Sequence, residues 1–316
     1  PAGMTAALNL ADQGFPVHLL ERENDLGGSL RDLHFLPALD GRGNQPDPRQ
    51  LLADLTQKIH RHPLVSTYLS AELLETDGFK GNFTSQVRQN GRTLTLEHGV
   101  ILIATGGREY DGDEYGRGRD PRVITQREFE KQLAEPGPEN DGEHPLPGRV
   151  AMIQCIGPAE SYCSRICCTT ALKNALKLKE RRPDAEVTVI NRDIRTYGFK
   201  ERLYTRAREE GVRFIHYEFD RKAEVILPEK ISSPGKNPEG ALQVRVWEPI
   251  LAREVSLEID QLVLSMPVVP ADGVKELARI LKLSIDQDGF FMEAHAKLRP
   301  VDFSADGVFM AGMAHY

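Results

Sequence analysis

All four cysteines of this 316-residue chain lie in one short window, QCIGPAESYCSRICCTTALKNALKLKE. An apolar run from Val150 to Gln154 comes first and predicts a buried strand, and a helical pattern then carries the last three cysteines. A dinucleotide-binding βαβ unit places its glycine-rich phosphate loop between such a strand and such a helix. Here thiols stand where that loop would be, and thiolates are soft ligands for zinc or iron–sulfur clusters. The window therefore predicts a metal centre in place of a nucleotide site.

The spacing of the cysteines indicates how their side chains converge. On a helix, Cys163 and Cys167 share a face because they are four residues apart. Cys168 points about 100° away from Cys167, and Cys155 comes from the end of the preceding strand. The alternatives are four inert thiols or a pair of disulfides, but the chain has no disulfide-scaffold composition and no recognisable signal peptide. Zinc usually takes two separated C-x2-4-C pairs, so the pattern favours an iron–sulfur cluster.

Composition and charge exclude several classes of function. The chain is 40% hydrophobic and 28% charged, which is ordinary for a soluble globular protein, and its length allows two domains. A formal net charge of −7 without a basic patch argues against a nucleic-acid partner. No apolar run approaches the length of a membrane span. We therefore expect a cytoplasmic protein.

The first residues predict part of a second dinucleotide-type unit. A helical apolar stripe ends at Gly14, and a short strand from Val17 to Leu20 follows. The next residue, Glu21, stands where dinucleotide folds bind a ribose hydroxyl. The helix would begin at the last glycine of a G-x-G-x-x-G loop whose first strand lies upstream, so we expect the chain to be truncated there. A Gly-Gly turn follows, where many FAD-binding two-domain reductases approach the flavin phosphates. The predicted FAD contacts in this region are Gly3, Glu21, Arg22, Gly27 and Gly28.

Two further strands predict additional flavin contacts. The segments GVILIATGG and DGVFMAGMAHY read as buried strands that end in small residues. In flavoprotein disulfide reductases both strand ends close on the FAD, and the second usually ends in Gly-Asp, whose Asp binds the flavin side chain. Here Met313 takes the place of that Asp. The predicted contacts at these strand ends are Ala104, Thr105, Gly106, Gly312 and Met313.

The order of these patterns predicts two Rossmann-like, three-layer α/β domains of the FAD-dependent disulfide-reductase type, truncated at both ends. Residues 1–148 would form the first part of the FAD domain. Residues 149–270 would form the second dinucleotide-type domain with the cysteines, and residues 271–316 would return to the FAD domain. An Asn90-Gly91 hairpin interrupts the first part, and VITQREFEKQLA reads as a short helix in the crossing to the second.

Four segments resemble the A subunit of heterodisulfide reductase, the flavin and iron–sulfur subunit of anaerobic electron-transfer complexes: YCSRICCTTALKNALKLKE, RDIRTYGFKERLY, GFFMEAHAKLRPVDF and GVFMAGMAHY. The resemblance covers essentially the whole chain. It implies a thioredoxin-reductase-like FAD fold and a [4Fe–4S] cluster whose ligands are Cys155, Cys163, Cys167 and Cys168. It also implies flavin-based handling of electrons, with bifurcation in some complexes. Because family members usually carry further ferredoxin-type cysteines, we expect this chain to be part of a longer subunit.

The resemblance also implies partners and flavin-tuning residues. The expected partners are disulfide-reducing subunits and a hydrogenase or other electron donor, and we expect a homo-oligomer. Lys173 lies on the cysteine helix, where a cation would stabilise the anionic reduced flavin. Glu128 would carry protons if it were buried. The plain alternative for both candidate catalytic residues is a solvated helix position.

The sequence therefore predicts an oxidoreductase that contains FAD and a [4Fe–4S] cluster and transfers electrons within a complex. One alternative is a stand-alone NAD(P)H-dependent disulfide reductase of the thioredoxin reductase class. Against it, the chain has no C-x-x-C redox pair, and Cys155-Ile156-Gly157-Pro158 stands where a second phosphate loop is needed. A non-catalytic scaffold with structural zinc is the other alternative.

Overall fold

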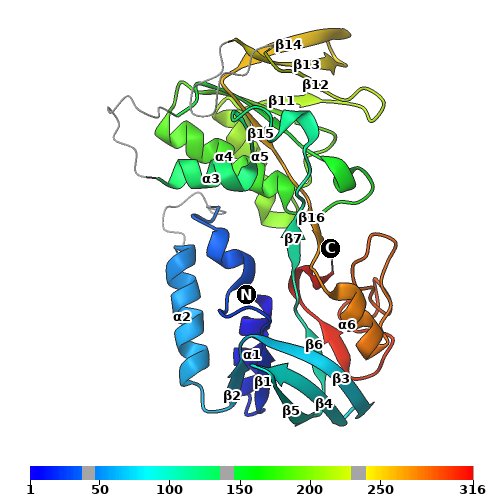
Figure 1. Ribbon diagram of the computed structural model, residues 1–316. Helices are drawn as coiled ribbons and strands as arrows, with labels where there is room; N and C mark the ends of the chain where they lie inside the picture. Colours follow the sequence, from blue (N-terminus) through cyan, green and yellow to red (C-terminus); the bar gives the residue numbers. More distant parts are fainter. Residues whose placement is uncertain (38–46, 136–145, 229–239, 316) are drawn as a thin grey trace. The chain divides into compact units, whose positions relative to one another are not determined.

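A computed structural model describes residues 1–37, 47–135, 146–228 and 240–315 of the chain (Figure 1). The chain divides into two units, and each consists of separate segments. Unit 1 comprises Pro1–Asp32, Asp47–Arg108 and Val268–Tyr316, and unit 2 comprises Leu33–Pro46 and Glu109–Pro267. The predicted boundary at residue 148 lies inside unit 2, because a strand and a helix before this residue join the second sheet.

Unit 1 begins with the predicted helix, turn and strand. Helix α1 (Ala2–Asp12) ends before Gly14, whose φ of +92° lies in the left-handed region that glycine adopts readily. Strand β1 (Val17–Leu20) pairs in parallel with β2 (Val65–Tyr68), and α2 (Pro48–Arg61) connects them. The core between these elements contains the buried residues Met4, Leu26 and Ile59.

The rest of unit 1 is built from a meander and a parallel strand pair. Strands β3 (Ala71–Phe79), β4 (Asn82–Gln89) and β5 (Arg92–His98) form an antiparallel sheet. The predicted hairpin is confirmed, because Asn90 and Gly91 join β4 to β5 with φ values of +49° and +76°. Strand β6 pairs in parallel with β17, and α6 packs on the same core. The bounds are β6 Ile101–Ile103, α6 Val274–Leu281, β17 Val308–Met310 and the 3-10 helices η1 Gly28–Asp32 and η5 Gly312–Ala314.

Unit 2 contains a five-stranded parallel sheet in the order β11-β10-β9-β15-β8. The predicted alternation of strands and helices after Val150 is confirmed. Both faces of the sheet are covered, as is usual for parallel strands: the helices α3, α4 and α5 share one hydrophobic core with it, and the antiparallel strands β13 and β14 share another. The bounds are β8 Val123–Thr125, α3 Gln126–Ala134, β9 Arg149–Ile153, α4 Cys167–Arg181, β10 Glu186–Asn191, α5 Glu201–Glu209, β11 Arg213–His216, β12 Glu224–Ile226, β13 Leu242–Glu248, β14 Arg253–Ile259 and β15 Gln261–Leu264.

Short elements complete the fold. The strands β7 (Gly107–Glu109) and β16 (Val268–Pro270) pair with each other. The remaining 3-10 helices are η2 Glu114–Gly116, η3 Gly157–Glu160 and η4 Gly198–Lys200. The predicted helix VITQREFEKQLA is wrong at its start: its first three residues form β8, and α3 begins at Gln126 behind the cap residue Thr125. Within the described ranges, no helix has the length and apolar composition needed to cross a membrane.

The strand order of unit 2 creates one favoured place for a ligand. From β9 the chain runs through α4 to its neighbour β10, whereas β15 lies on the other side of β9. In open α/β sheets, ligands bind outside the carboxyl ends of the strands where the order reverses. Cys155 lies two residues after β9, and Met266 lies two residues after β15. The cysteine window therefore starts at this switch point.

Candidate metal centre and flavin site

The structure places the four cysteines on a loop and on the first turn of one helix. Cys167 and Cys168 are the first two residues of α4, whereas Cys163 lies in the loop before it. The prediction that one helix carries Cys163, Cys167 and Cys168 is therefore wrong. The helix cannot extend back to Cys163 because Arg165 has a φ of +60°, which interrupts right-handed helical geometry.

The thiols of the window lie close enough to influence one another electrostatically. Burial and the neighbouring Cys168, Cys155 and Cys163 raise the pKa of Cys167 to about 12. Burial also raises the pKa of Cys168 to about 11, with Cys155 and Cys163 adding to the effect. These two thiols are therefore protonated at neutral pH in the metal-free protein. A metal must displace their protons when it binds.

Backbone groups approach the sulfur atoms from a second loop, which follows β10. The backbone N–H groups of Arg192 and Arg195 donate hydrogen bonds to the sulfurs of Cys155 and Cys168, and both hydrogen bonds favour the thiolate form. The N–H of Arg165 donates to the Sγ of Cys163 over 3.4 Å. Hydrogen bonds to the ligating sulfurs are among the contacts that tune iron–sulfur clusters.

Arg192 and Arg195 were missed as members of the site. The one sequence signal for them is that they follow a predicted strand. Neighbouring parallel strands end at the same edge of a sheet, so residues after this strand can lie beside Cys155. The thiol of Cys168 donates to the carbonyl of Asp193 in the same loop, with a distance of 3.7 Å. The thiol of Cys167 donates to the carbonyl of Met266 over 3.7 Å, so the segment after β15 also reaches the site.

The cysteine loop is held in an unfavourable backbone conformation. Cys155 and Arg165 both have a φ of +60°, a region that costs a residue with a side chain about 1–3 kcal/mol. A buried polar network lies directly behind Cys155: Gln154 Nε2 donates to Ser265 Oγ over 2.6 Å, and Tyr217 donates to the carbonyl of Gln154 over 3.0 Å. This network fixes the ends of β9 and β15 and so supports the strained loop.

The donor set fits an iron–sulfur cluster. Four thiols and sulfur-directed N–H groups form the surroundings that such clusters use. A zinc ion would require its thiolates at about 2.3 Å in a closed tetrahedron. Within the described part of the chain, no three His, Cys, Asp or Glu side chains are arranged to hold a metal ion. The four thiols nevertheless lie close enough to influence one another's pKa values.

The predicted flavin residues of unit 1 converge through contacts between small residues. A Cβ atom on Gly3 would lie 3.2 Å from the Cβ of Ala104, and one on Gly312 would lie 2.7 Å from the Cβ of Ala2. Gly28 approaches Pro1, since a Cβ atom added at Gly28 would lie 3.7 Å from the Cδ of that proline. The start of α1, the ends of β6 and β17 and the Gly-Gly turn therefore meet. We call this meeting point the cradle; close backbone approach of this kind is what a dinucleotide pyrophosphate requires.

Two of the other predicted flavin residues, Glu21 and Arg22, have hydrogen-bond partners within unit 1. The Glu21 carboxylate accepts a hydrogen bond from the N–H of Glu23 over 3.0 Å. Arg22 donates to the carbonyl of Asp272 over 2.8 Å, which connects the loop after β1 to the segment before α6. Thr105 and Gly106 continue from Ala104, and Met313 is half-buried beside Gly312. All of them stay predictions.

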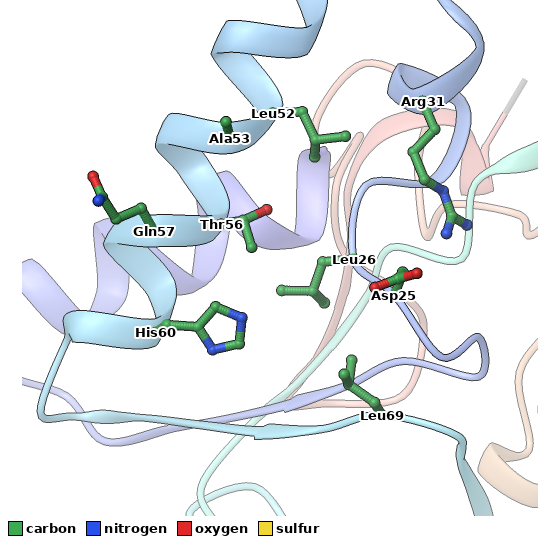
Figure 2. A pocket seen from close by; sticks show the side chains of 9 residues that line it. All are labelled: Asp25, Leu26, Arg31, Leu52, Ala53, Thr56, Gln57, His60 and Leu69. Atoms are coloured by element: carbon green, nitrogen blue, oxygen red, sulfur yellow. The ribbon is translucent and has the colours of Figure 1, made fainter.

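A pocket of about 430 Å³ adjoins the Gly-Gly turn (Figure 2). Leu52 and Thr56 of α2 point toward Leu26 across it, and Arg31 lies at its upper right in the view. Gly27 packs the turn onto α2, since a Cβ atom there would lie 2.8 Å from Leu52. No residue predicted to bind flavin lines this pocket.

The two flavin-tuning candidates have structural partners. Lys173 is buried and donates to Glu130 over 2.6 Å and to the carbonyl of Phe35 over 3.0 Å. Burial lowers the pKa of Lys173, and Glu130 opposes that shift. Glu128 caps α3 by accepting a hydrogen bond from the N–H of Thr125, and its side chain is 52% exposed. The burial that a proton-carrying role for Glu128 requires is absent, and Glu130 is the buried carboxylate that sequence reasoning missed.

Comparison with known proteins identifies similar chains. The chain is 30% identical to the A subunit of the H(2):CoB-CoM heterodisulfide,ferredoxin reductase of Methanothermobacter marburgensis, over 99% of this chain and 59% of that protein. It is also 30% identical to the iron-sulfur A subunit of the CoB--CoM heterodisulfide reductase of Methanocaldococcus jannaschii, with the same coverage. The first alignment runs over 408 positions, whereas this chain has 316 residues, so the relative carries segments in the matched region without a counterpart here.

Solved structures confirm the predicted fold class. The thioredoxin reductase of T. acidophilum superposes with a TM-score of 0.55 over 98% of this chain and 86% of that chain, at 16% identity. The Lactococcus lactis enzyme gives 0.58 over the same shares, at 15% identity. A scan against protein-family models finds no match. The curated relatives confirm the predicted resemblance: over 99% of its own length, this chain is a homologue of the A subunits of heterodisulfide reductases.

Proposed function

We propose that the chain forms the flavin and iron–sulfur core of an electron-transfer subunit in a heterodisulfide-reductase-type complex. The observation that carries the proposal is the gathering of four thiols at the switch point of the sheet in unit 2, in a homologue of such subunits. The chain spans 59% of the length of these relatives, so the activity of the whole protein is part of the proposal.

In this proposal, Cys155, Cys163, Cys167 and Cys168 hold a [4Fe–4S] cluster. The backbone N–H groups of Arg192 and Arg195 stabilise sulfur in its thiolate form. Cys168 is buried, and a hydrogen bond is stronger where water is excluded. When both cofactors are bound to the protein, the cluster would transfer one electron at a time and the FAD would transfer two.

The FAD would lie against unit 1. The cradle of Gly3, Gly28, Ala104 and Gly312 would leave room for the pyrophosphate, and the start of α1 would direct its N–H groups at it. Glu21 would receive the ribose hydroxyls. Arg22, Gly27, Thr105, Gly106 and Met313 complete the proposed set.

We extend the proposal to the partners and the setting. The relatives are named as subunits of reductases that act on the CoB–CoM heterodisulfide, with hydrogen or ferredoxin in several of the names. Disulfide-reducing subunits and an electron donor such as a hydrogenase would assemble with the present chain in the cytoplasm, as a homo-oligomer. Electron bifurcation at the flavin is a further expectation of the same kind.

The stand-alone reductase is the competing function, and one observation argues against it. A nicotinamide cofactor needs a phosphate loop with free N–H groups after β9. Cys155 and Pro158 stand there, and proline has no N–H to donate. We therefore propose that electrons reach the chain from a protein and not from NADH or NADPH.

The test is anaerobic purification of the full-length protein with analysis of iron, acid-labile sulfide, zinc and flavin. Relative to a variant in which the four cysteines of the window are replaced by serine, we expect the wild type to hold about four more irons and four more sulfides per chain, and both to hold one FAD. A difference of one zinc without sulfide would contradict the cluster, and absence of flavin after incubation with FAD would contradict the cradle. Fast flavin bleaching by NADH or NADPH alone would revive the stand-alone reductase.

A further inference from the structure

Exposed apolar side chains gather at one edge of unit 2. Three segments follow β9, β10 and β11, whose carboxyl ends lie side by side in the sheet. They are residues 160–166, 191–202 and 217–222, and we call them the carboxyl rim. Among the described residues of unit 2, six large hydrophobic side chains are exposed, and four of them lie on this rim: Ile166, Tyr197, Phe199 and Phe219.

The rim directly borders the cysteines. Ile166 immediately precedes Cys167, and Tyr197 follows Arg195, whose N–H reaches Cys168, by two residues. The guanidinium of Arg192 lies 5.2 Å from the ring of Phe219, and its Nη1 donates to the carbonyl of Glu160 over 3.2 Å. Two segments of the rim therefore adjoin the proposed cluster, and the third contacts them through Arg192.

The rim carries a charge opposite to that of the whole chain. It has seven Arg and Lys residues against five Asp and Glu residues, whereas the chain has a net charge of −7. Several of these cations lie over exposed rings: Arg202 lies 5.2 Å from the ring of Phe199, and Lys222 lies 5.1 Å from that of Phe219. Aromatic and arginine side chains together are typical of the centres of protein interfaces.

We propose that the carboxyl rim is the docking surface for an acidic one-electron carrier protein. The inference rests on the proposed cluster, because docking here places the carrier next to the cysteines. The exposed rings of Tyr197 and Phe199, 57% and 72% exposed, supply the apolar contact. The surrounding cations attract an acidic partner and speed its encounter, as in other transient complexes with small contact areas.

The test measures binding of a purified acidic ferredoxin to the anaerobic, iron-loaded full-length protein, at low ionic strength and at about 0.15 M salt. Two variants probe the rim: Tyr197→Ala with Phe199→Ala, and Lys200→Glu with Arg202→Glu. The matched controls are Ile250→Ala with Leu251→Ala, which are exposed on the turn after β13, and Lys275→Glu with Lys282→Glu, which are exposed in unit 1.

We expect each rim variant to raise the Kd by about tenfold or more at low salt, and each control by less than about twofold. The charge reversal should lose most of its effect at the higher salt concentration. If the Kd for ferredoxin is the same in the rim variants as in the wild type or the control variants, the proposal is wrong. Self-association that depends on Tyr197 and Phe199, without ferredoxin binding, would assign the rim to a second copy of the chain.

Two measurements separate this inference from the function on which it rests. Iron and sulfide are determined on every sample. A wild type without a cluster would contradict the proposed function. Its affinity for ferredoxin would still test whether the rim is a docking surface. Thermal unfolding shows whether the alanine variant is folded. If it is not, the charge reversal, at two side chains outside the core, decides the question.

Discussion

The two units carry different kinds of residues at the carboxyl ends of their parallel strands. In unit 1 the strand ends carry small residues, and Gly312 approaches Ala2 so closely that no side chain fits between them. In unit 2 the corresponding edge carries thiols, backed by the buried Gln154 and Ser265. One edge lets backbone N–H groups reach a ligand, whereas the other offers side-chain ligands. If the proposed sites are right, the fold places both at strand ends, and the local side chains decide which ligand each one takes.

The largest expected effect comes from removing a thiol in unit 2. Cys167→Ser should abolish iron and sulfide binding at the cysteine window, because the hydroxyl is a poor ligand for the cluster. FAD binding should persist, since the cradle lies in the other unit. Metal and flavin analysis of one sample measures both, and Thr170→Ala on the same helix is the control. Retention of iron in the Cys167 variant would remove this residue from the ligand set.

The next effect concerns the buried pair of unit 2. Lys173→Met leaves Glu130 buried without its cation, so the free energy of unfolding should fall by about 3–5 kcal/mol. Lys177→Met, which breaks an exposed pair with Glu180, should cost about 0–1 kcal/mol. Chemical denaturation measures both. An unchanged stability together with a shifted flavin potential would instead support the flavin-tuning role of Lys173.

A smaller effect should appear at the cradle of unit 1. Gly312→Ala adds a Cβ atom 2.7 Å from that of Ala2 at a φ of +66°, so the proposed FAD site must open. We expect the Kd for FAD to rise by about tenfold, with the cluster unaffected. Gly14→Ala is the matched control, because it has a φ of +92° but open space around it. If the Kd for FAD rises equally in both variants, the cause is backbone strain, and the proposal that FAD binds at the cradle is contradicted.

The smallest effect separates two roles of Glu128. Glu128→Ala should destabilise the protein by about 1 kcal/mol through loss of the capping box, whereas Glu128→Gln should preserve the cap. Neither variant should change the pH dependence of flavin reduction, because the carboxylate is largely exposed. If the Gln variant slows flavin reduction while stability is kept, Glu128 is a proton carrier after all.

Local sequence patterns determined much of the fold. The alternation of apolar runs and helical stripes predicts the strands and helices after Val150, and Asn90-Gly91 predicts the hairpin, because both signals depend on residues close in the chain. The cysteine window predicts a site at a strand end for the same reason. These features act over a few residues, so the sequence alone contains them.

Only the tertiary structure decided the contacts between distant segments. The start of α4 depends on Arg165, whose backbone conformation is set by the packing of the loop. The N–H groups of Arg192 and Arg195 reach the sulfurs because β10 lies beside β9. Lys173 finds its partner in Glu130, which is 43 residues away in sequence. Such contacts depend on which elements become neighbours, and neighbours in space are selected by burial of the whole core.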